Sequence, residues 1–357
     1  TNAFDLNFIE RPTKGAAIAL KARALLYAAS PLFNGGNIEP ANPVTGYTNF
    51  SADRWQKAEQ AALELIELSQ FELMDDFKSV FITQANKERI FSKQGGAPNI
   101  SVETNNGPVG YSVSINNGRT SPTQELVNAF GMANGLQITD VASGYQPNNP
   151  YANRDPRFYA TIFHNGSQWL GRQVQTYEGG ADKPGGSKQQ TRTGYYARKF
   201  MGNFENVIRY DNVNHDYTLF RYAEVLLNYA EARNEFLTEP DNEVYGNVEA
   251  IRQRAGLNPY QLPAGLTKLQ MRDIIHNERR KELAFEEHRF YDVRRWKQAE
   301  DLFDKQVHGM VIYQTGTGTI YQEVPVLQLN FEKKMYLAPI PFYEVAKNRK
   351  MVQNPGW

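Results

Sequence analysis

The chain has 357 residues, 41% of them apolar and 22% charged, so it can bury a substantial core as a globular protein. Lys plus Arg equal Asp plus Glu at 39 each, and this balance lacks the basic excess typical of proteins that bind nucleic acid or anionic membranes. No cysteine is present, which excludes disulfides, thiolate catalysis and cysteine-ligated metals.

The first predicted element is an alanine-rich helix from about Pro12 to Ser30, ended by Pro31. Its small side chains allow a second helix to approach closely. That second helix is predicted from about Asp53 to Ser69, with Ser51 as its N-cap. Its apolar face consists of Trp55, Ala58, Ala62, Leu65 and Ile66. The two segments predict a helical hairpin.

The middle of the chain, about residues 75–216, is dense in Asn, Gly, Gln and Tyr. Its one firm helix is predicted to open at Ser121-Pro122-Thr123-Gln124. In that reading Ser121 is the N-cap, Pro122 takes the first helical position and Gln124 completes a capping box. Long irregular segments inside a compact domain are usually functional, so this region is the predicted place of the function.

The pattern Ala22-x-x-Leu-Leu-x-x-Ala29 recurs at Ala223–Ala230, and a second helix follows it from about Asn242 to Ala255, with Gly256 as a left-handed stop. Recurring helical hairpins with small residues at the crossing predict a tetratricopeptide-like solenoid.

The next helix is predicted to open at Thr267, with a capping box to Gln270, and to continue to about His288. Seven consecutive polar residues, 276–282, place charge on every face of this helix. Either its inner face buries paired charges, or the helix is a solvated surface helix. Asp292, Arg294 and Arg295 are the predicted partners in the first case. The tail is predicted to be extended over residues 336–341, with a short helix before Gln353–Trp357.

Motifs for catalysis, metals and cofactors are weak. No two of the five histidines stand three or four apart, as a helical metal face requires. Residues 110–114 lack the last glycine of a nucleophile elbow, and Gly186 occupies the lysine position of a phosphate loop. Asp211-x-x-Asn-x-Asp216 lacks the glycine and distal glutamate of a calcium loop, which favours a plain turn. We therefore expect no enzyme activity, no cofactor and no metal, although two carboxylates from separate segments leave a glycosidase open.

Several ordered motifs carry a family resemblance: residues 11–17 (RPTKGAA), 221–232 (RYAEVLLNYAEA), 251–257 (IRQRAGL), 278–283 (ERRKEL), 286–292 (EEHRFYD), 337–341 (LAPIP) and 353–357 (QNPGW). Together they resemble the SusD (RagB) family of bacterial outer-membrane nutrient-binding lipoproteins, from about residue 11 to the last residue. The resemblance implies a mainly α, tetratricopeptide-like superhelical fold with a long loop-rich insertion.

The resemblance also implies a function. Such a protein binds oligosaccharides or polysaccharides without catalysis at the cell surface, on the outer membrane, and passes them to a SusC-like TonB-dependent transporter. The alternatives are a peptide-binding member of the family and a helical-repeat scaffold for another protein. Members begin with a lipidated cysteine and further helices, so we expect an N-terminal portion, with the lipid anchor, to precede this segment. No apolar run here reaches the about 18 residues that span a bilayer, and residues 1–10 lack the regions of a signal peptide.

The expected organisation is a helical hairpin at 1–74, a ligand-binding loop region at 75–216 and a helical scaffold with a tail at 217–357, in one structural domain. Among the family motifs, Arg279, Glu282, Arg289 and Asp292 are expected to form buried pairs that support the scaffold.

A sugar presents apolar faces ringed by hydroxyls, so its site needs aromatic platforms beside planar hydrogen-bonding groups. The candidate platforms in the loop region are Tyr111, Tyr145, Tyr151, Trp169 and Tyr177. The candidate hydrogen-bonding groups are Asn116, Asn117, Asn165, Gln168 and Arg172. Trp169, set between Gly166 and Gly171, is the first choice, and a packing anchor is the alternative role for its ring.

Overall fold

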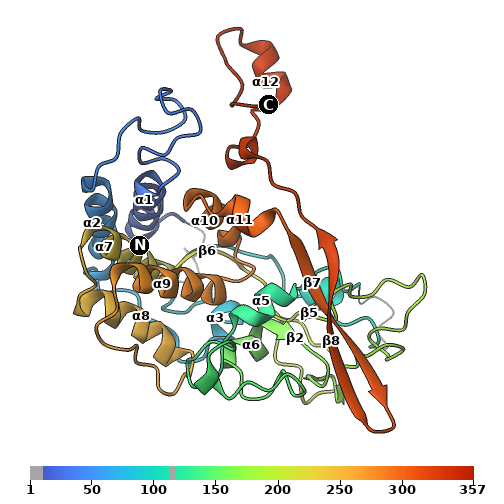
Figure 1. The fold of residues 1–357 in the computed structure, drawn as a ribbon. Coiled ribbons are helices and arrows are strands. Elements are labelled where there is room, and N and C mark those ends of the chain that lie inside the picture. Colours follow the sequence, from blue (N-terminus) through green and yellow to red (C-terminus); the bar gives the residue numbers. More distant parts are fainter. Residues whose placement is uncertain (1–10, 112–116) are drawn as a thin grey trace.

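The computed structural model describes residues 11–111 and 117–357, and it confirms the predicted mainly helical fold (Figure 1). The long helices gather on one side of the molecule, and the short helices and strands of the middle region lie on the other (Figure 1). A long β-hairpin and the C-terminal tail extend from this body in different directions.

The first helical hairpin consists of α1 (Lys14–Ala29) and α2 (Asp53–Ile66), as predicted. Ala19, Ala22 and Ala62 are buried where the two helices meet, so the small side chains do allow close packing. The predicted N-cap of α2 is wrong. The cap position is Ala52, and the backbone of Ser51 is instead bonded by the side chain of Asn34 at 2.9 and 3.0 Å.

The central helix of the scaffold is α7 (Tyr222–Phe236), which packs against α1, α2, α8 (Asn242–Arg254) and α9 (Lys268–Glu282). Contacts on several sides explain why most of its residues are buried. Gly256 has the predicted left-handed conformation, with φ of +80°. The capping box of Thr267 and Gln270 is also confirmed. The α9 helix, however, ends at Glu282 rather than at His288.

The early end of α9 results from a sharp change of direction. Phe285 and Glu287 adopt positive φ angles of 63° and 64°, which interrupt the helix, and α10 (His288–Arg295) begins directly after them. A short helix, α11 (Ala299–Phe303), follows.

The middle region contains only short elements. Its helices are α3 (Ser79–Ile82), α4 (Ser101–Asn106), α5 (Gln124–Ala129), the 3-10 turn η1 (Val141–Ser143) and α6 (Pro156–Thr161). Its short strand pairs are β2 (Ile162–Phe163) with β5 (Tyr196–Ala197) and β3 (Gln168–Trp169) with β4 (Arg172–Gln173). Strand β1 (Arg89–Lys93) pairs antiparallel with β6 (Tyr217–Arg221), which leads directly into α7. The N-cap of α5 is Thr123, without a side-chain bond, so the predicted capping by Ser121 is wrong.

The largest feature that sequence reasoning missed is the hairpin of β7 (Gln306–Thr315) and β8 (Gly318–Gln328). Its strands pair antiparallel from Gln306 opposite Gln328 to Thr315 opposite Gly318, with one register shift after Val307. Met310 and Ile312 anchor β7 in the core of the middle region, and the far end extends past the body (Figure 1). The tail then forms the 3-10 turn η2 (Lys333–Tyr336) and α12 (Phe342–Lys347), on the opposite side of the body.

The polar face of α9 buries paired charges, and this result excludes the solvated alternative. Glu282 lies within 2.9 Å of guanidinium nitrogens of Arg157, Arg221 and Arg254. These residues come from α6, the end of β6 and the end of α8, so one carboxylate joins the middle region to the helical scaffold.

A second buried network confirms the predicted pairing of Arg279 with Asp292, at 3.2 Å. Arg295 joins the same network through Asp292, at 2.8 Å, and Glu231, at 2.5 Å. Two predictions are wrong. Arg294 packs on Phe290 and donates to the Met335 carbonyl at 2.9 Å, and Arg289 has no ion pair among the described residues.

Candidate ligand-binding site

The best organised polar group of the middle region is centred on the buried carboxylate of Asp182. It accepts hydrogen bonds from the backbone N–H groups of Gly110 and Gln175, at 2.9 and 2.8 Å, and from the Arg172 guanidinium at 2.8 and 3.2 Å. These four bonds come from two separate stretches of chain, at Gly110 and at residues 172–175, and they fix both stretches relative to the loop that carries Asp182. Asp182 is therefore a structural centre for the loop surface.

Tyr111 and Arg172 lie against each other beside the Asp182 carboxylate. The Arg172 guanidinium lies 3.6 Å from the centroid of the Tyr111 ring, and the Tyr111 hydroxyl donates to the Arg172 carbonyl at 3.3 Å. Burial is the main cause that raises the pKa of Tyr111. The Tyr111 ring is buried under Arg172, whereas Arg172 is half-buried and keeps an exposed part. Of this pair, the guanidinium is the group that a ligand can reach.

Trp169 lies in the same cluster, but its side chain is 0% exposed. Its ring packs edge-on against Phe163 and Phe204, at 4.8 and 5.6 Å, and its indole N–H donates to the Tyr210 hydroxyl at 3.2 Å. Leu170, at φ of +43°, and Gly171 form the tight turn that holds it. In this position Trp169 has the alternative role of a packing anchor, since no face of its ring is open for a sugar.

Tyr177 and Tyr145 are half-buried, and both lie beside the β7–β8 hairpin. Tyr177 packs on the core cluster that contains Ile312, and the neighbouring Glu178 N–H donates to the Ile312 carbonyl at 2.9 Å. Tyr145 faces Arg154, whose guanidinium lies 5.6 Å from its ring. Both tyrosines retain an accessible part.

The remaining predicted residues have mixed positions. Tyr151 is buried in an aromatic group with Phe158 and Tyr195. Asn117 is half-buried, and its carbonyl accepts a bond from the exposed side chain of Gln189 at 2.5 Å. The Asn165 side chain accepts from the Thr176 N–H at 3.0 Å, and Gln168 is exposed on β3. Asn116 and the last three residues of the 110–114 motif, 112–114, lie outside the described residues.

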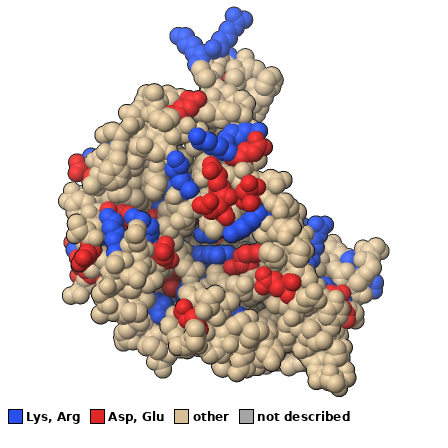
Figure 2. Space-filling model, viewed as in Figure 1, with Lys and Arg blue, Asp and Glu red and all other residues tan. Residues whose placement is uncertain are grey.

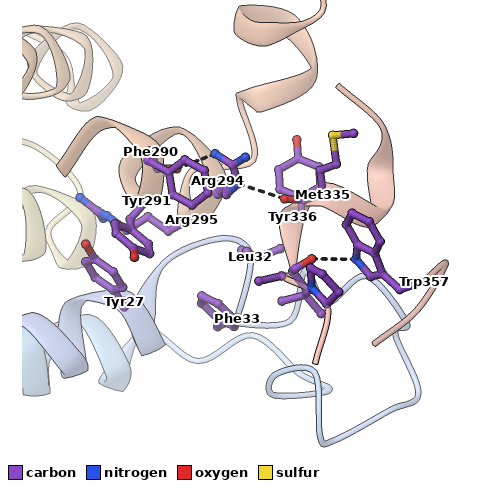
Figure 3. A pocket seen from close by; sticks show the side chains of 13 residues that line it. Tyr27, Leu32, Phe33, Phe290, Tyr291, Arg294, Arg295, Met335, Tyr336 and Trp357 are labelled. Carbon is purple, nitrogen blue, oxygen red and sulfur yellow. Dashed lines mark hydrogen bonds between the residues drawn. The ribbon is translucent and has the colours of Figure 1, made fainter. Parts of the chain in front are cut away.

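A cavity of about 430 Å³ lies where α1, α10 and the C-terminal tail meet, outside the predicted region. Tyr27 and Tyr291 stand at one end and Trp357 at the other, with Arg294 stacked 3.5 Å above Phe290 between them (Figure 3). Phe290, Tyr291 and Trp357 are 52%, 51% and 45% exposed. The cavity therefore offers the open aromatic faces that the buried Trp169 lacks.

Hydrogen-bonding groups adjoin this aromatic cavity. Burial, with the nearby Asp292, raises the pKa of Tyr27 to about 12, so its hydroxyl stays protonated at neutral pH and can donate. Tyr27 and Tyr291 are shared with a neighbouring polar pocket of about 300 Å³, which also includes Arg23, Tyr217 and Glu287. Aromatic faces next to such groups are the chemistry that a saccharide requires.

Sequence reasoning missed these aromatic residues because it assigned their motifs to the scaffold. A signal was present at Phe290-Tyr291. Neighbouring residues on a helix point about 100° apart, so two adjacent aromatics in a polar segment favour exposure of at least one ring. The residue after them, Asp292, is the buried one.

The described residues show no group of three or more His, Asp or Glu side chains suited to hold a metal ion. In the 211–216 cluster, Asp216 instead pairs with Arg89 at 2.8 Å and accepts from the Gly95 N–H at 3.2 Å. Within the same described ranges, no helix combines the length and the apolar character needed to cross a bilayer.

Known proteins resemble this chain in sequence and in structure. The SusD family profile matches residues 85–357. SusD-like protein P2 of Formosa agariphila is 34% identical over 149 residues, which are 40% of this chain and 26% of that protein.

Among solved structures, a SusD-like protein from Bacteroides fragilis aligns with a TM-score of 0.79 and 29% identity, over 99% of this chain and 67% of that one. A SusD-like carbohydrate binding protein from the same species aligns with a TM-score of 0.70 and 23% identity, over 97% of this chain and 66% of that one, and this likeness shows the fold alone. The chain thus spans about two thirds of these structures, while the alignment to the curated relative spans about a quarter of that protein.

Proposed function

The chain belongs to the SusD family, and on that premise we propose that it binds oligosaccharide or polysaccharide nutrients without catalysis. In this proposal the protein acts at the surface of the outer membrane and delivers its ligand to a SusC-like TonB-dependent transporter. The observation that carries the proposal is the family match over residues 85–357.

We place the ligand contacts on the loop surface within residues 75–216. Arg172 can bond sugar hydroxyls, because among the described residues no acceptor takes its Nε–H. Tyr177 and Tyr145 provide partly open rings, and Asn117 provides an amide. Tyr111 and Trp169 act beneath this surface by holding Arg172 and the β3–β4 turn in place. The aromatic cavity of Figure 3 is the second place at which a sugar ring can stack.

The test is a binding screen of the protein against a panel of soluble polysaccharides by affinity electrophoresis. Retardation by a glycan with no release of reducing sugar would support binding without turnover. Arg172→Ala tests the loop surface and Tyr291→Ala tests the aromatic cavity. Arg349→Ala, on the exposed tail, is the control for loss of one charge.

Each result has a defined meaning. Loss of retardation in Arg172→Ala alone supports the loop surface, and loss in Tyr291→Ala alone moves the site to the aromatic cavity. Products released from the glycans would establish a hydrolase and overturn the proposal. If no glycan is bound, a peptide library and a search for a protein partner decide between the two alternatives.

A further inference from the structure

A second large cavity, of about 370 Å³, lies between α5, the α9–α10 junction, α11 and the start of β7. It is separate from the loop surface around Asp182. Most of its wall is apolar, formed by Leu126, Phe285, Phe290, Leu302, Phe303 and Leu329. Such a wall favours an apolar ligand, since sugar hydroxyls buried against it would lose their hydrogen bonds to water without replacement.

Three basic side chains, those of Arg280, Arg289 and Lys305, line the same cavity and outnumber its two carboxylates. Among the described residues, Arg280 has one hydrogen bond, from Nη2 to the Glu125 carbonyl at 2.7 Å. Arg289 forms no hydrogen bond or ion pair with any described residue, although it stands one turn from the well-paired Asp292. Figure 2 shows basic side chains in the hollow at the centre of the molecule, between α11 and α5, with acidic side chains directly beside them.

An unpaired guanidinium in this position carries an electrostatic cost. Burial, together with the nearby Arg280, lowers the pKa of Arg289 to about 10. An anion placed between the guanidinium groups of Arg280 and Arg289 would offset the repulsion between these two charges. It would also take the place of the water that burial removes from Arg289.

Two carboxylates, those of Glu125 and Glu287, also line the cavity. Glu125 Oε1 accepts from the backbone N–H of His308 at 2.9 Å and lies 2.8 Å from its Nδ1, and the buried Oε2 has no hydrogen-bond partner among the described residues. Glu287 is exposed and is hydrogen-bonded to the Tyr217 hydroxyl. Within the described part of the chain, neither carboxylate forms an ion pair with Arg289.

We propose that this cavity binds an amphipathic carboxylate, with its carboxyl group on Arg280 and Arg289 and its apolar body against the wall of Leu302, Phe303 and Leu329. Arginine binds carboxylates through paired N–H donors, which suits a cavity lined by two guanidinium groups. The volume corresponds to about a dozen water molecules at roughly 30 Å³ each, so a ligand of roughly a dozen non-hydrogen atoms fits. The proposal is independent of glycan binding on the loop surface, because Arg172, Tyr177, Tyr145 and Asn117 do not line this cavity, whereas Phe290 is shared with the aromatic cavity.

The experiment is isothermal titration calorimetry with two acids and their uncharged counterparts. Octanoate and octanol share an apolar chain and differ in charge, and N-acetyl-phenylalanine and its amide make the same comparison for a peptide end. Binding of octanoate alone identifies an acyl chain as the source of the carboxylate, and binding of the amino acid alone identifies a peptide end. Either result supports the proposal.

The variants are Arg289→Ala and Arg289→Lys, with Arg349→Ala as the charge control. We expect Arg289→Ala to weaken binding of the acid roughly tenfold or more, the effect of losing a hydrogen bond to a charged group, and Arg289→Lys to restore part of it. If Arg289→Ala does not fold, by near-UV circular dichroism, the exposed Lys305→Ala is used and a smaller loss is expected. Three outcomes would overturn the proposal: equal affinity for acids and uncharged counterparts, unchanged affinity in the variants, or no binding of either acid at about 1 mM.

Discussion

Glu282 and Arg221 are joined by two hydrogen bonds of different kinds. The Glu282 carboxylate accepts from Arg221 Nη1 at 2.7 Å, and the main-chain carbonyl of Glu282 accepts from Arg221 Nη2 at 2.9 Å. The last residue of α9 is thereby fixed to the residue that precedes α7. Because Arg157 and Arg254 share the same carboxylate, its removal affects four segments at once.

We predict that Glu282→Ala lowers the unfolding free energy by about 3–5 kcal/mol, because three buried guanidinium groups lose their common partner. At about 2 °C per kcal/mol for a chain of this size, the thermal midpoint should fall by roughly 6–10 °C in differential scanning calorimetry. Glu72→Ala removes a surface carboxylate that pairs with Lys87 at 2.6 Å and should leave the midpoint almost unchanged. Equal effects of the two substitutions would contradict the prediction.

Stability should fall steadily with acid. Burial lowers the pKa of His164 to about 4 and of His276 to about 3, from an ordinary 6.5. The unfolded chain therefore binds more protons than the folded chain below pH 6.5, and stability is lost as the pH falls through this range.

Glu224 and Glu278 extend that loss to lower pH. Burial opposes the ionised form of both, but Arg23 beside Glu224 and Arg157 beside Glu278 lower each pKa to about 2, from 4.5. Their contribution is present above pH 4.5 and disappears between about 4.5 and 2. Urea denaturation at a series of pH values checks the prediction, and His276→Gln should flatten the upper part of the curve. A stability that does not change between pH 6.5 and 4 would refute the assignment to the histidines.

Trp169 and Tyr145 should respond differently to truncation. Trp169→Ala empties a packed site and should cost about 3–5 kcal/mol of unfolding free energy. Any loss of glycan binding in that variant would therefore accompany a loss of structure. Tyr145→Ala removes a half-buried ring and should change the thermal midpoint much less. Chemical denaturation of both variants, read by circular dichroism, makes the comparison, and a stable Trp169→Ala protein would show that the ring is not a packing anchor.

The C-terminal tail should loosen when Gln353 is truncated. The Gln353 side chain bonds both the N–H and the carbonyl of Ile340, at 2.7 and 2.8 Å, and Asn354 donates to the Ala338 carbonyl at 2.6 Å. Gln353→Ala should speed hydrogen exchange at residues 338–341 and leave exchange in α7 unchanged, because this part of the tail lies away from α7 (Figure 1). The control is Val352→Ala, whose side chain is exposed. Unaltered exchange at Ile340 would argue against the contact.

The helical scaffold was predictable because local signals and packing agree there. Three signals each determine the structure of only a few neighbouring residues. They are the alanines of α1, the capping box at Thr267 and the helix stop at Gly256. The end of α9 was not predictable in the same way. Residues 283–288 continue a helix-forming composition, and the positive φ angles at Phe285 and Glu287 are set by contacts with other segments. Lys199, for example, donates to the carbonyls of Glu282 and Ala284, both at 2.9 Å.

The candidate site was predictable only in part, because the side chains that suit a sugar also suit a core. The grouping of Tyr111, Arg172 and Asp182 depends on contacts between residues up to 72 positions apart, which composition does not reveal. The hairpin of β7 and β8 did carry a local signal. Segments rich in Val, Ile and Tyr lie on both sides of Gly316-Thr-Gly318, a composition typical of a β-hairpin with a glycine turn.

The carboxylate of Glu282, which three arginines share, also helps to fix the register of α9 against the elements that surround it. Moving α9 by a single position along its axis would rotate its side chains by about 100° and turn Glu282 away from all three arginines. An apolar interface tolerates such a slip, since one aliphatic side chain replaces another at modest cost. A set of buried charges does not, because every misaligned register leaves several ions dehydrated and unmatched. The network therefore favours a single register of α9 against its neighbours. It also favours a single orientation of the middle region relative to the helical scaffold.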